Sequence, residues 1–442
     1  MSADAGFDPA LDPGLDRIKA ALPTNGPPVT LRIAYSGGRD SHVLLHWLAG
    51  QRAALAPHRL RAVHVEHGLH PDSARWADHC AAVCAALGLP LDVRRVDAHP
   101  ARGDSAEAAA RTARYAALAA DMQAGDLLLT AHHQDDQAET VLLALLRGAG
   151  LAGAAAMPGL RRFGPGWLLR PLLDWPASRL ARYAYTHALQ WVEDPSNGDA
   201  RFDRNFLRAE ALPLLGRRWP AASAGLARHA THAAEAQALL DELAAADGAT
   251  ADTLAVTQLA ALSAPRQRNL LRGWLRANGV PAPSRARLEA LRHQALTAGA
   301  DRLPYLPLGK HAVRIWQGRL HLTPEPLPAV PAGPVQWRLD APLDVPGIGR
   351  LQAQVSLGTG IAAALLGEPA MVEVRFRSDI SGGKALKKRL QAMAVPPWER
   401  GRVPLLFRGA QLLQVAGQAP RTHARAVDGQ PGYCIAWQPA KD

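Results

Sequence analysis

The chain has few cysteines, and none is arranged for metal binding. Only three occur in 442 residues, Cys80, Cys84 and Cys434, and no C-x-x-C pair is present. The sequence therefore signals neither a zinc ribbon nor an iron–sulfur cluster. Cys80 and Cys84 are one helical turn apart, and we expect them to be packed thiols. So little cysteine fits a reducing cytoplasm.

Long apolar runs are missing too. No stretch of about 20 strongly apolar residues predicts a membrane span, and the first residues lack the basic and apolar regions of a signal peptide. A hydrophobic content of 48% nevertheless excludes a disordered chain, and the length allows several domains. The net charge of +11 favours a polyanionic partner, most simply nucleic acid.

One turn joins a predicted buried strand, Val29 to Tyr35, to a predicted helix. Its residues are Ser36, Gly37, Gly38, Arg39, Asp40 and Ser41. It lacks the lysine of a Walker A loop and the spacing of G-x-G-x-x-G. Its glycines let the backbone approach a ligand, and a helix N-terminus favours an anion. We therefore predict a nucleotide-phosphate site; an ordinary tight turn is the alternative.

The first half of the chain alternates predicted strands and helices, which indicates an α/β fold with a doubly wound parallel sheet. Ligands of such sheets bind beyond the carboxyl ends of the strands. The Ser36 turn, the segment His64–Leu69 and a cluster at His132 should therefore share one rim. The Gly- and Pro-rich stretch 148–166 is expected to be a loop over this site.

Three domains are predicted. Residues 1–218 would form the α/β domain, residues 219–325 a helical domain, and residues 335–442 a small α+β or β-rich domain after a Pro-rich linker. The sequence leaves both a monomer and a homodimer open.

The segment from His132 to Thr140, HHQDDQAET, places two histidines and three carboxylates between a strand and a helix. Capping of the helix by acids explains one carboxylate. A metal site is a second possibility, because histidine and aspartate are both ligands. We favour carboxylates that hold Mg²⁺ on a nucleotide or the ammonium group of a substrate.

Arginines form two further candidate sites. Arg111 either makes a surface pair with Glu107 one helical turn away or reaches the phosphates. The segment Arg201 to Arg208, RFDRNFLR, sets aromatic rings among arginines. That composition suits single-stranded RNA, and it suits a capped surface helix equally well.

The C-terminal part carries a basic tail. A predicted basic helix lies beside Trp398, and neighbouring prolines restrict the backbone of this residue. The helix and the ring could together bind a phosphate backbone. A solvated helix face is the alternative. The candidate phosphate contacts are Arg375, Arg377, Lys384, Lys387, Lys388, Arg389 and Arg400.

Together these segments resemble the tRNA(Ile)-lysidine synthetases, a family of N-type ATP pyrophosphatases. SGGRDS is similar to the family's pyrophosphate loop, and HHQDDQAET followed by Arg147 and Gly148 is similar to its second motif. EDPSN…RNFLR and KKRLQAMAVPPWERGRVPLL resemble further family segments, so the resemblance spans nearly the whole chain. The chain departs from the pattern at Glu66, where relatives often carry a second histidine.

The resemblance implies an adenine nucleotide alpha hydrolase-like catalytic domain, a helical middle domain and a C-terminal tRNA-binding domain. It implies ATP-dependent ligation of L-lysine to C2 of the wobble cytidine of the isoleucine tRNA with a CAU anticodon. The reaction would pass through an adenylated tRNA and release AMP and pyrophosphate. ATP and Mg²⁺ are the implied cofactors, in a cytoplasmic enzyme without a membrane partner.

Roles for individual residues follow from the same resemblance. The ATP loop would be Ser36 to Ser41, with Asp40 for Mg²⁺ and catalysis. Asp135, Asp136 and Glu139 are candidates for lysine, and Asp136 is also a catalytic candidate. His133 and Arg111 would contact AMP or the phosphates. Arg204, Arg208 and the basic tail would contact tRNA.

Three other functions remain open. The chain could be another tRNA-modifying ATP pyrophosphatase such as a thiolase, although that chemistry favours reactive cysteine pairs. It could be a tRNA-binding protein without catalysis. It could also be a metal phosphohydrolase that uses His132, His133, Asp135 and Asp136.

Overall fold

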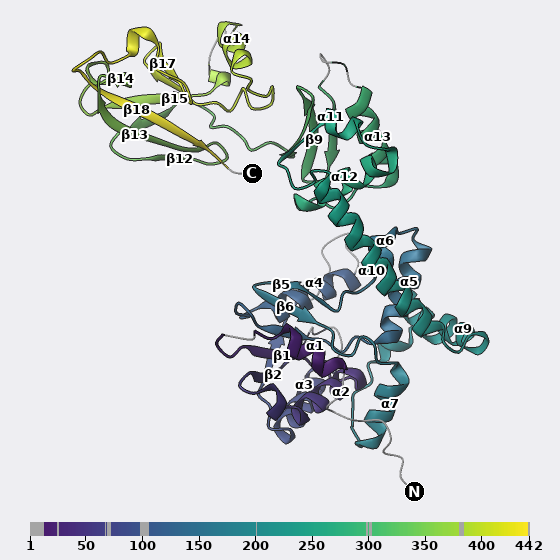
Figure 1. The fold of residues 1–442 in the computed structure, drawn as a ribbon. Helices are drawn as coiled ribbons and strands as arrows, with labels where there is room; N and C mark the ends of the chain where they lie inside the picture. Colours follow the sequence, from purple (N-terminus) through teal and green to yellow (C-terminus); the bar gives the residue numbers. More distant parts are fainter. Residues whose placement is uncertain are drawn as a thin grey trace. The chain divides into compact units, whose positions relative to one another are not determined.

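The computed structural model describes residues 13–23, 26–66, 68, 72–97, 106–199, 201–297, 299, 303–379 and 384–440. The chain divides into two compact units, Met1–Leu239 and Leu240–Asp442 (Figure 1). Some residues named from the sequence lie outside the described part. They are His67, Leu69, the glycines before Lys384, and the side chains of Glu107 and Lys384.

The first unit alternates strands and helices, as predicted. Its strands are β1 (Thr30–Ala34), β2 (Arg59–Glu66), β3 (Leu91–Arg95), β4 (Leu127–Leu129), β5 (Leu160–Phe163) and β6 (Gly166–Leu169). Its helices are α1 (Pro13–Ala21), α2 (Arg39–Gly50), α3 (Ser73–Ala86), α4 (Ala106–Ala119), α5 (Gln134–Leu146), α6 (Leu151–Ala154), α7 (Ala177–Thr186), α8 (Asp203–Phe206) and α9 (Leu212–Arg218). The long helix α10 (Ala222–Ala246) spans the boundary of the two units.

The six strands form one sheet in the order β3-β2-β1-β4-β6-β5. All neighbours pair in parallel except the edge strand β5, which is antiparallel to β6. From β1 the chain continues outward to β2 and β3, and it then returns to place β4 on the other side of β1. The gap between the ends of β1 and β4 is thus the switch point at which such sheets bind ligands.

Two apolar cores cover the two faces of this sheet. Leu127 and Leu129 of β4 point into the larger core, which includes Trp47 of α2, whereas Leu128 points into the smaller core beneath α4. This alternation is the two-residue period of a strand buried on both faces. The doubly wound parallel sheet predicted from the sequence is therefore confirmed.

The cysteine prediction is also confirmed for the first unit. Cys80 and Cys84 are both buried free thiols on α3. Burial raises the pKa of Cys80 to about 12 and that of Cys84 to about 11. Both thiols are therefore protonated near neutral pH and are poor nucleophiles.

The second unit starts with helices and continues with antiparallel strands. Its helices are α11 (Val256–Ala260), α12 (Ala264–Ala277), α13 (Arg285–Thr297) and α14 (Lys384–Ala392). The strands β7 (Thr253–Ala255), β8 (Tyr305–Leu308), β9 (His311–Trp316) and β10 (Arg319–Pro324) make one sheet. Two more sheets hold β11 (Val335–Arg338), β12 (Leu343–Val345), β13 (Gly349–Leu357), β14 (Ile361–Ala362), β15 (Met371–Arg375), β16 (Leu405–Arg408), β17 (Gln411–Val415) and β18 (Pro431–Pro439).

Two local predictions were wrong. The stretch 148–166 is not only loop, because it contains α6 and the edge strand β5. The helical region holds α10 to α13 as expected, but its sheet was not predicted. The β9–β10 hairpin turns at Gln317 and Gly318, whose φ angles of 46° and 70° suit a two-residue hairpin turn. The three-domain division stays a prediction.

Among the described residues, no helix is both long enough and apolar enough to cross a membrane.

A buried ion pair fixes the start of β1 against β4. The Asp126 carboxylate accepts hydrogen bonds from the Thr30 and Gln123 backbone N–H groups, and its Oδ2 lies 3.3 Å from Nε of Arg32. Both side chains of the pair are less than a tenth exposed. Asp126 therefore ties the two central strands together at the end opposite the switch point.

We expect Asp126→Ala to destabilise the protein by about 3–5 kcal/mol, because it leaves the buried Arg32 charge without its partner. Equilibrium unfolding in urea measures the change. The matched control is Asp203→Ala, which removes the exposed pair with Arg147 and should cost less than about 1 kcal/mol. Equal decreases in the free energy of unfolding of the two variants would contradict a role for the burial of the ion pair.

Candidate active site

The turn Ser36–Ser41, hereafter the Ser36 loop, connects β1 to α2 at the switch point. Gly37 has a φ of 87°, which L side chains rarely adopt. The Ser36 and Ser41 hydroxyl oxygens lie 3.0 Å apart, and the Ser41 hydroxyl donates to the Gly38 carbonyl at 2.9 Å. The loop is thus held by its own side chains and leads into the positive end of the α2 dipole, which favours a phosphate.

Two neighbours enclose the loop. A Cβ atom on Gly37 would lie 3.2 Å from the Cys80 sulfur, so the sulfur would have to move by a few tenths of an ångström to admit a side chain there. The Val192 backbone N–H donates to the Gly37 carbonyl at 3.0 Å. The sequence segment Trp191–Asp194 is therefore brought against the loop.

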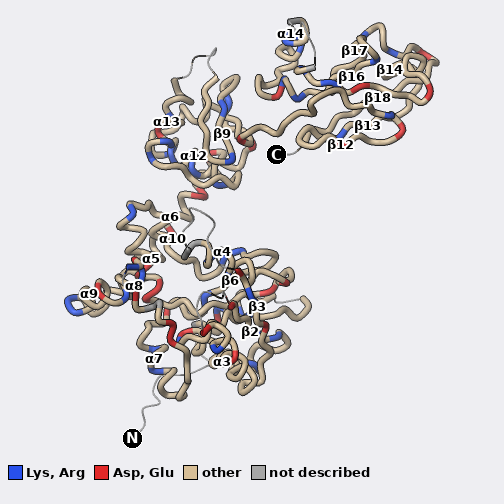
Figure 2. The backbone as a smooth tube through the Cα atoms, turned by 180° about the vertical axis from the view of Figure 1, so that it is seen from behind, with Lys and Arg blue, Asp and Glu red and all other residues tan. Residues whose placement is uncertain are grey.

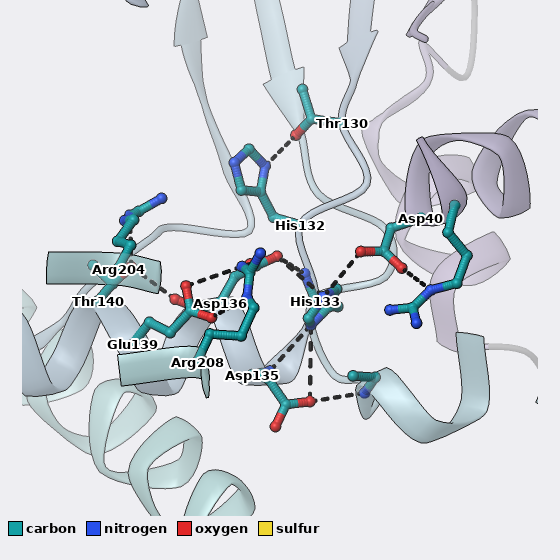
Figure 3. Close-up of polar contacts among 12 residues, drawn as sticks. Asp40, Thr130, His132, His133, Asp135, Asp136, Glu139, Thr140, Arg204 and Arg208 are labelled. Carbon is teal, nitrogen blue, oxygen red and sulfur yellow. Dashed lines mark hydrogen bonds and ion pairs between the residues drawn. The ribbon is translucent and has the colours of Figure 1, made fainter. Parts of the chain in front are cut away.

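The segment after β4 faces the loop across the switch point (Figure 3). Nε2 of His133 lies 3.4 Å from Oδ2 of Asp40 and 3.5 Å from Oδ2 of Asp136. His133 is the N-cap of α5, and its Nδ1 accepts the Asp135 backbone N–H at 3.2 Å. Since Nδ1 is the acceptor, the proton on Nε2 is directed at the carboxylates.

These charges shift the pKa values of Asp40 and His133 in opposite directions. Burial raises the pKa of Asp40, but the contact with His133 and the nearby Arg39 outweigh it and hold the pKa below its ordinary value. Burial lowers the pKa of His133, but Asp40 and Asp136 outweigh it and raise the pKa. Asp40 is therefore an ionised carboxylate beside the phosphate loop at neutral pH.

The three acids of α5 have different partners. Asp135 accepts the Ala177 backbone N–H at 2.8 Å and so caps the first turn of α7. Asp136 accepts the His133 N–H at 3.0 Å and caps its own helix. Glu139 is fully buried and receives two hydrogen bonds from Arg208. Asp136 and Glu139 thus form one acidic pair, whereas Asp135 is engaged elsewhere.

A basic cluster lies on the other side of His132. Burial and the nearby charges of Arg170, Arg204 and Arg111 lower the pKa of His132 to about 3, so its ring is neutral. Nδ1 of His132 lies 2.9 Å from the Thr130 hydroxyl. The guanidinium of Arg111 lies 4.9 Å from the ring centre of Tyr115. A neutral ring surrounded by arginines suits an anionic ligand.

Arg170 was missed in the sequence. It is only 3% exposed, its Nη1 donates to the Pro158 carbonyl, and its Nε has no hydrogen-bond partner in the described part of the chain. It directly follows β6, and the Ser36 loop follows β1 after one residue, Tyr35. Its place at the end of the apolar segment Trp167–Leu169 is the signal that could have identified it.

Two of the other residues named from the sequence, Glu66 and Arg201, have partners outside this centre, whereas Arg204 and Arg208 lie at it. Glu66 receives a hydrogen bond from Nε of Arg95 at 3.0 Å, and the exposed Arg201 pairs with the partly buried Asp199. Arg204 donates to the Thr140 hydroxyl at 3.2 Å, so it and Arg208 both contact α5.

The basic tail belongs to the second unit and separates into two groups. Lys387 and Lys388 are exposed on α14, whose Leu386 and Leu390 are buried. Figure 2 shows basic residues in blue on α14. The other predicted residues with described side chains are at least partly buried: Arg375, Arg377, Arg389 and Arg400. The two lysines are thus the tail residues best placed for a polyanion.

Three of these four arginines contact the protein itself. Nε of Arg375 donates to Glu373 at 3.0 Å, and Nε of Arg389 donates to Gln418 at 2.6 Å. Nε of Arg400 donates to the Val395 carbonyl, and this residue is only 9% exposed. The placement of Arg400 favours a structural role over the predicted contact with tRNA.

Trp398 likewise packs inside the second unit. Its ring centre lies 5.3 Å from that of His321 and 6.3 Å from that of Trp316. The expected grip of this ring on a phosphate backbone is therefore not supported by its position.

Comparison with known proteins identifies the family. Residues 16–215 match the family described as PP-loop domain, residues 254–321 the TilS substrate binding domain, and residues 372–437 the TilS substrate C-terminal domain. The chain is 46% identical to the tRNA(Ile)-lysidine synthase of Alkalilimnicola ehrlichii over 96% of both chains. It is 42% identical to that of Methylococcus capsulatus, covering 91% of this chain and 94% of the relative.

The chain belongs to the tRNA(Ile)-lysidine synthase family. The family resemblance seen in the sequence is thereby confirmed. In this member of the tRNA(Ile)-lysidine synthases, the PP-loop match contains both the Ser36 loop and the acidic pair. The two TilS matches fall on the sheet of β7 to β10 and on the C-terminal sheets.

We expect Asp40→Asn to lower the pKa of His133, because the carboxylate that contacts Nε2 loses its charge. A raised histidine pKa adds stability below its ordinary value of 6.5, and this contribution is lost as pH rises through the pKa of the folded protein. The free energy of unfolding of the variant should therefore decrease mainly at pH values below 6.5. NMR titration of the His133 ring protons measures the pKa.

Asp199→Asn is the control for this titration, since Asp199 contacts the exposed Arg201. An unchanged His133 pKa in Asp40→Asn would show that the 3.4 Å contact carries no charge coupling.

Proposed function

We propose that this protein ligates L-lysine to C2 of the wobble cytidine of the CAU-anticodon isoleucine tRNA at the expense of ATP. The observation that carries the proposal is the meeting of a phosphate loop, Ser36–Ser41, with a buried acidic pair, Asp136 and Glu139, at one switch point. The loop suits a nucleotide polyphosphate, and the pair suits a cationic amine. Family membership supports this combination.

The reaction has two balanced steps. The cytidine O2 attacks the α-phosphorus of ATP, so an O–P bond forms, the bond to the β-phosphate breaks, and pyrophosphate leaves. The lysine ε-amine then attacks C2, a C–N bond forms, and AMP leaves with the oxygen. The ε-ammonium loses one proton to a base before it attacks and a second as AMP leaves, so the nitrogen keeps one hydrogen and the product is lysidine.

The Ser36 loop would hold the polyphosphate through its backbone and the N-terminus of α2. Asp40 fits Mg²⁺, because it is an ionised carboxylate at the edge of this loop. Bound there together with the phosphates, Mg²⁺ would offset negative charge on the leaving pyrophosphate. Arg111 and the neighbouring basic cluster would stabilise the same anion. His133 would keep Asp40 and the start of α5 in place.

The acidic pair would bind the lysine ammonium. An ordinary ε-ammonium has a pKa of about 10.4 and is unreactive at neutral pH, so a neighbouring base must take a proton. Burial raises the pKa of Glu139, which brings this carboxylate closer to the range of a useful base. Asp135 is the weaker candidate for lysine, since it caps α7.

A thiolase is not favoured. Cys80 lies directly behind Gly37, but its raised pKa keeps it a thiol, and Cys84 is also buried. A metal phosphohydrolase is not supported either. Among the described residues, no group of three or more histidine, cysteine or acidic side chains could hold a metal ion.

The test of the proposal combines the protein, ATP, Mg²⁺, labelled lysine and tRNA transcripts. We expect label only in the isoleucine tRNA with the CAU anticodon. Asp40→Ala should reduce incorporation about 100-fold or more, the usual effect of removing one electrostatic group from such a site. If the wild-type protein binds tRNA but incorporates no labelled lysine, the proposed ligation is wrong and the protein binds tRNA without catalysis.

We further expect the α14 lysines to contact tRNA phosphates. The double variant Lys387→Gln, Lys388→Gln should weaken binding of all tRNAs alike and reduce the slope of log K against log salt by about 1.5–2. Filter binding at several salt concentrations measures this slope. Arg350→Gln is the control, because it removes a half-exposed charge from β13. The same slope in all three proteins would exclude α14 from the interface.

A further inference from the structure

Arg208 occupies the acidic pair in this structure. Its Nε lies 2.7 Å from Oε1 of Glu139, and its Nη2 lies 3.1 Å from Oε2 of Glu139 and 2.8 Å from Oδ1 of Asp136 (Figure 3). One guanidinium thus holds three oxygens of the two carboxylates. A cation in this position stands where the ammonium of a substrate would stand.

The two sides of this contact differ in exposure. The Glu139 side chain is 0% exposed and that of Asp136 is 13% exposed, whereas the Arg208 side chain is 53% exposed. The carboxylates are therefore part of the protein interior, and the guanidinium reaches them from the solvent side. Arg208 can leave along this open side without disturbing the core.

The backbone that carries Arg208 is also unusual. Leu207–Ala211 forms a π-helical turn between α8 and α9. Such turns are rare and occur frequently at functional sites, because they rotate a side chain away from the regular helical position. Here the turn directs Arg208 at α5.

We propose that Arg208 is an internal competitor of the substrate amine, which keeps the acidic pair neutralised until lysine replaces it. The inference rests on the proposed function, because it takes the acidic pair as the lysine site. It goes beyond that function by giving Arg208 a role before tRNA contact.

The negative charges of the acidic pair require that one cation leaves only when another takes its place. If Arg208 left without a replacement, Glu139 would lose its hydrogen-bonded cation and face the Asp136 carboxylate inside the protein, with Arg204 nearby and with His133 lying 3.5 Å from Asp136. Two buried carboxylates do not stay ionised together without a partner. Arg208 is therefore released when an ammonium group enters, and the pair keeps one tightly bound cation throughout.

The released guanidinium then becomes available to an anion. Arg204 lies on the adjacent α8 and also contacts α5, through the Thr140 hydroxyl. Released Arg208 and Arg204 together can bind a tRNA phosphate. Lysine should therefore favour tRNA binding, and by reciprocity tRNA should favour lysine binding to the same degree.

The experiment measures lysine binding to the full-length protein by calorimetry, with and without the isoleucine tRNA transcript. Wild-type protein should bind lysine more tightly once tRNA is present. Arg208→Gln should bind lysine at least about threefold more tightly than wild type without tRNA, since the competing state is removed. In this variant the effect of tRNA on lysine should disappear.

Arg201→Gln is the matched control, because it removes an exposed arginine of the same segment whose partner is Asp199 rather than the acidic pair. It should leave the affinity for lysine without tRNA unchanged. If Arg208→Gln fails to fold, Arg208→Lys serves instead. Its shorter cation should hold Glu139 less well and also raise the affinity for lysine.

The outcomes separate the two proposals. Weaker lysine binding in Arg208→Gln, or unchanged coupling to tRNA, would overturn the role of Arg208 while lysine binding itself stands. Lysine binding that survives in Asp136→Asn, Glu139→Gln would move the amine to another site. That result would overturn the proposed exchange of Arg208 for lysine, whereas the ligation of lysine to tRNA would stand. No lysine binding in wild type or any variant would instead defeat the proposed function.

Discussion

The parallel pairing of β1 with both β2 and β4 is the constraint on which the catalytic unit depends. It sets Leu31 beside Leu60 on one side and Leu127 on the other, so the carboxyl ends of β1 and β4 lie within one residue of each other. The buried Asp126 secures this register from the opposite end. Because the register is fixed, two loops that are remote in sequence leave the sheet within hydrogen-bonding distance of each other. The contact between Asp40 and His133 is the direct result.

The site is divided by charge around this gap. Carboxylates gather on α5, and arginines gather around Tyr115 and His132. Burial lowers the pKa of both His132 and His133, but the shifts end in opposite directions, because the arginines lower the pKa of His132 further whereas Asp40 and Asp136 outweigh burial at His133. A reaction that brings together an amine and a polyphosphate needs such a division, since one uniform field would repel one of the two ligands.

Much of the fold and part of the site could be predicted from the sequence, for a physical reason. The Ser36 loop and the HHQDDQAET segment each lie within one short stretch, and the strand before each is strongly apolar, so their shared rim follows from topology. The cap that Asp135 gives to α7 and the position of Arg170 depend on contacts between distant segments. The sheet of β7 to β10 was missed because its strands are short and its hairpin signal, Gln317 and Gly318, was weak.

The thiol behind the Ser36 loop couples the side-chain sizes that two distant positions can hold. The sulfur of Cys80 fills the space in which a side chain at position 37 would lie. A larger residue at position 80 on α3 would therefore press on the Ser36 loop from behind. Gly37 has no side chain that could be shortened to make room. Substitutions at position 80 are thus limited by size, as well as by the contact of the sulfur with the buried His64. In this way, a buried residue that touches no substrate restricts the sequences in which the phosphate site stays open.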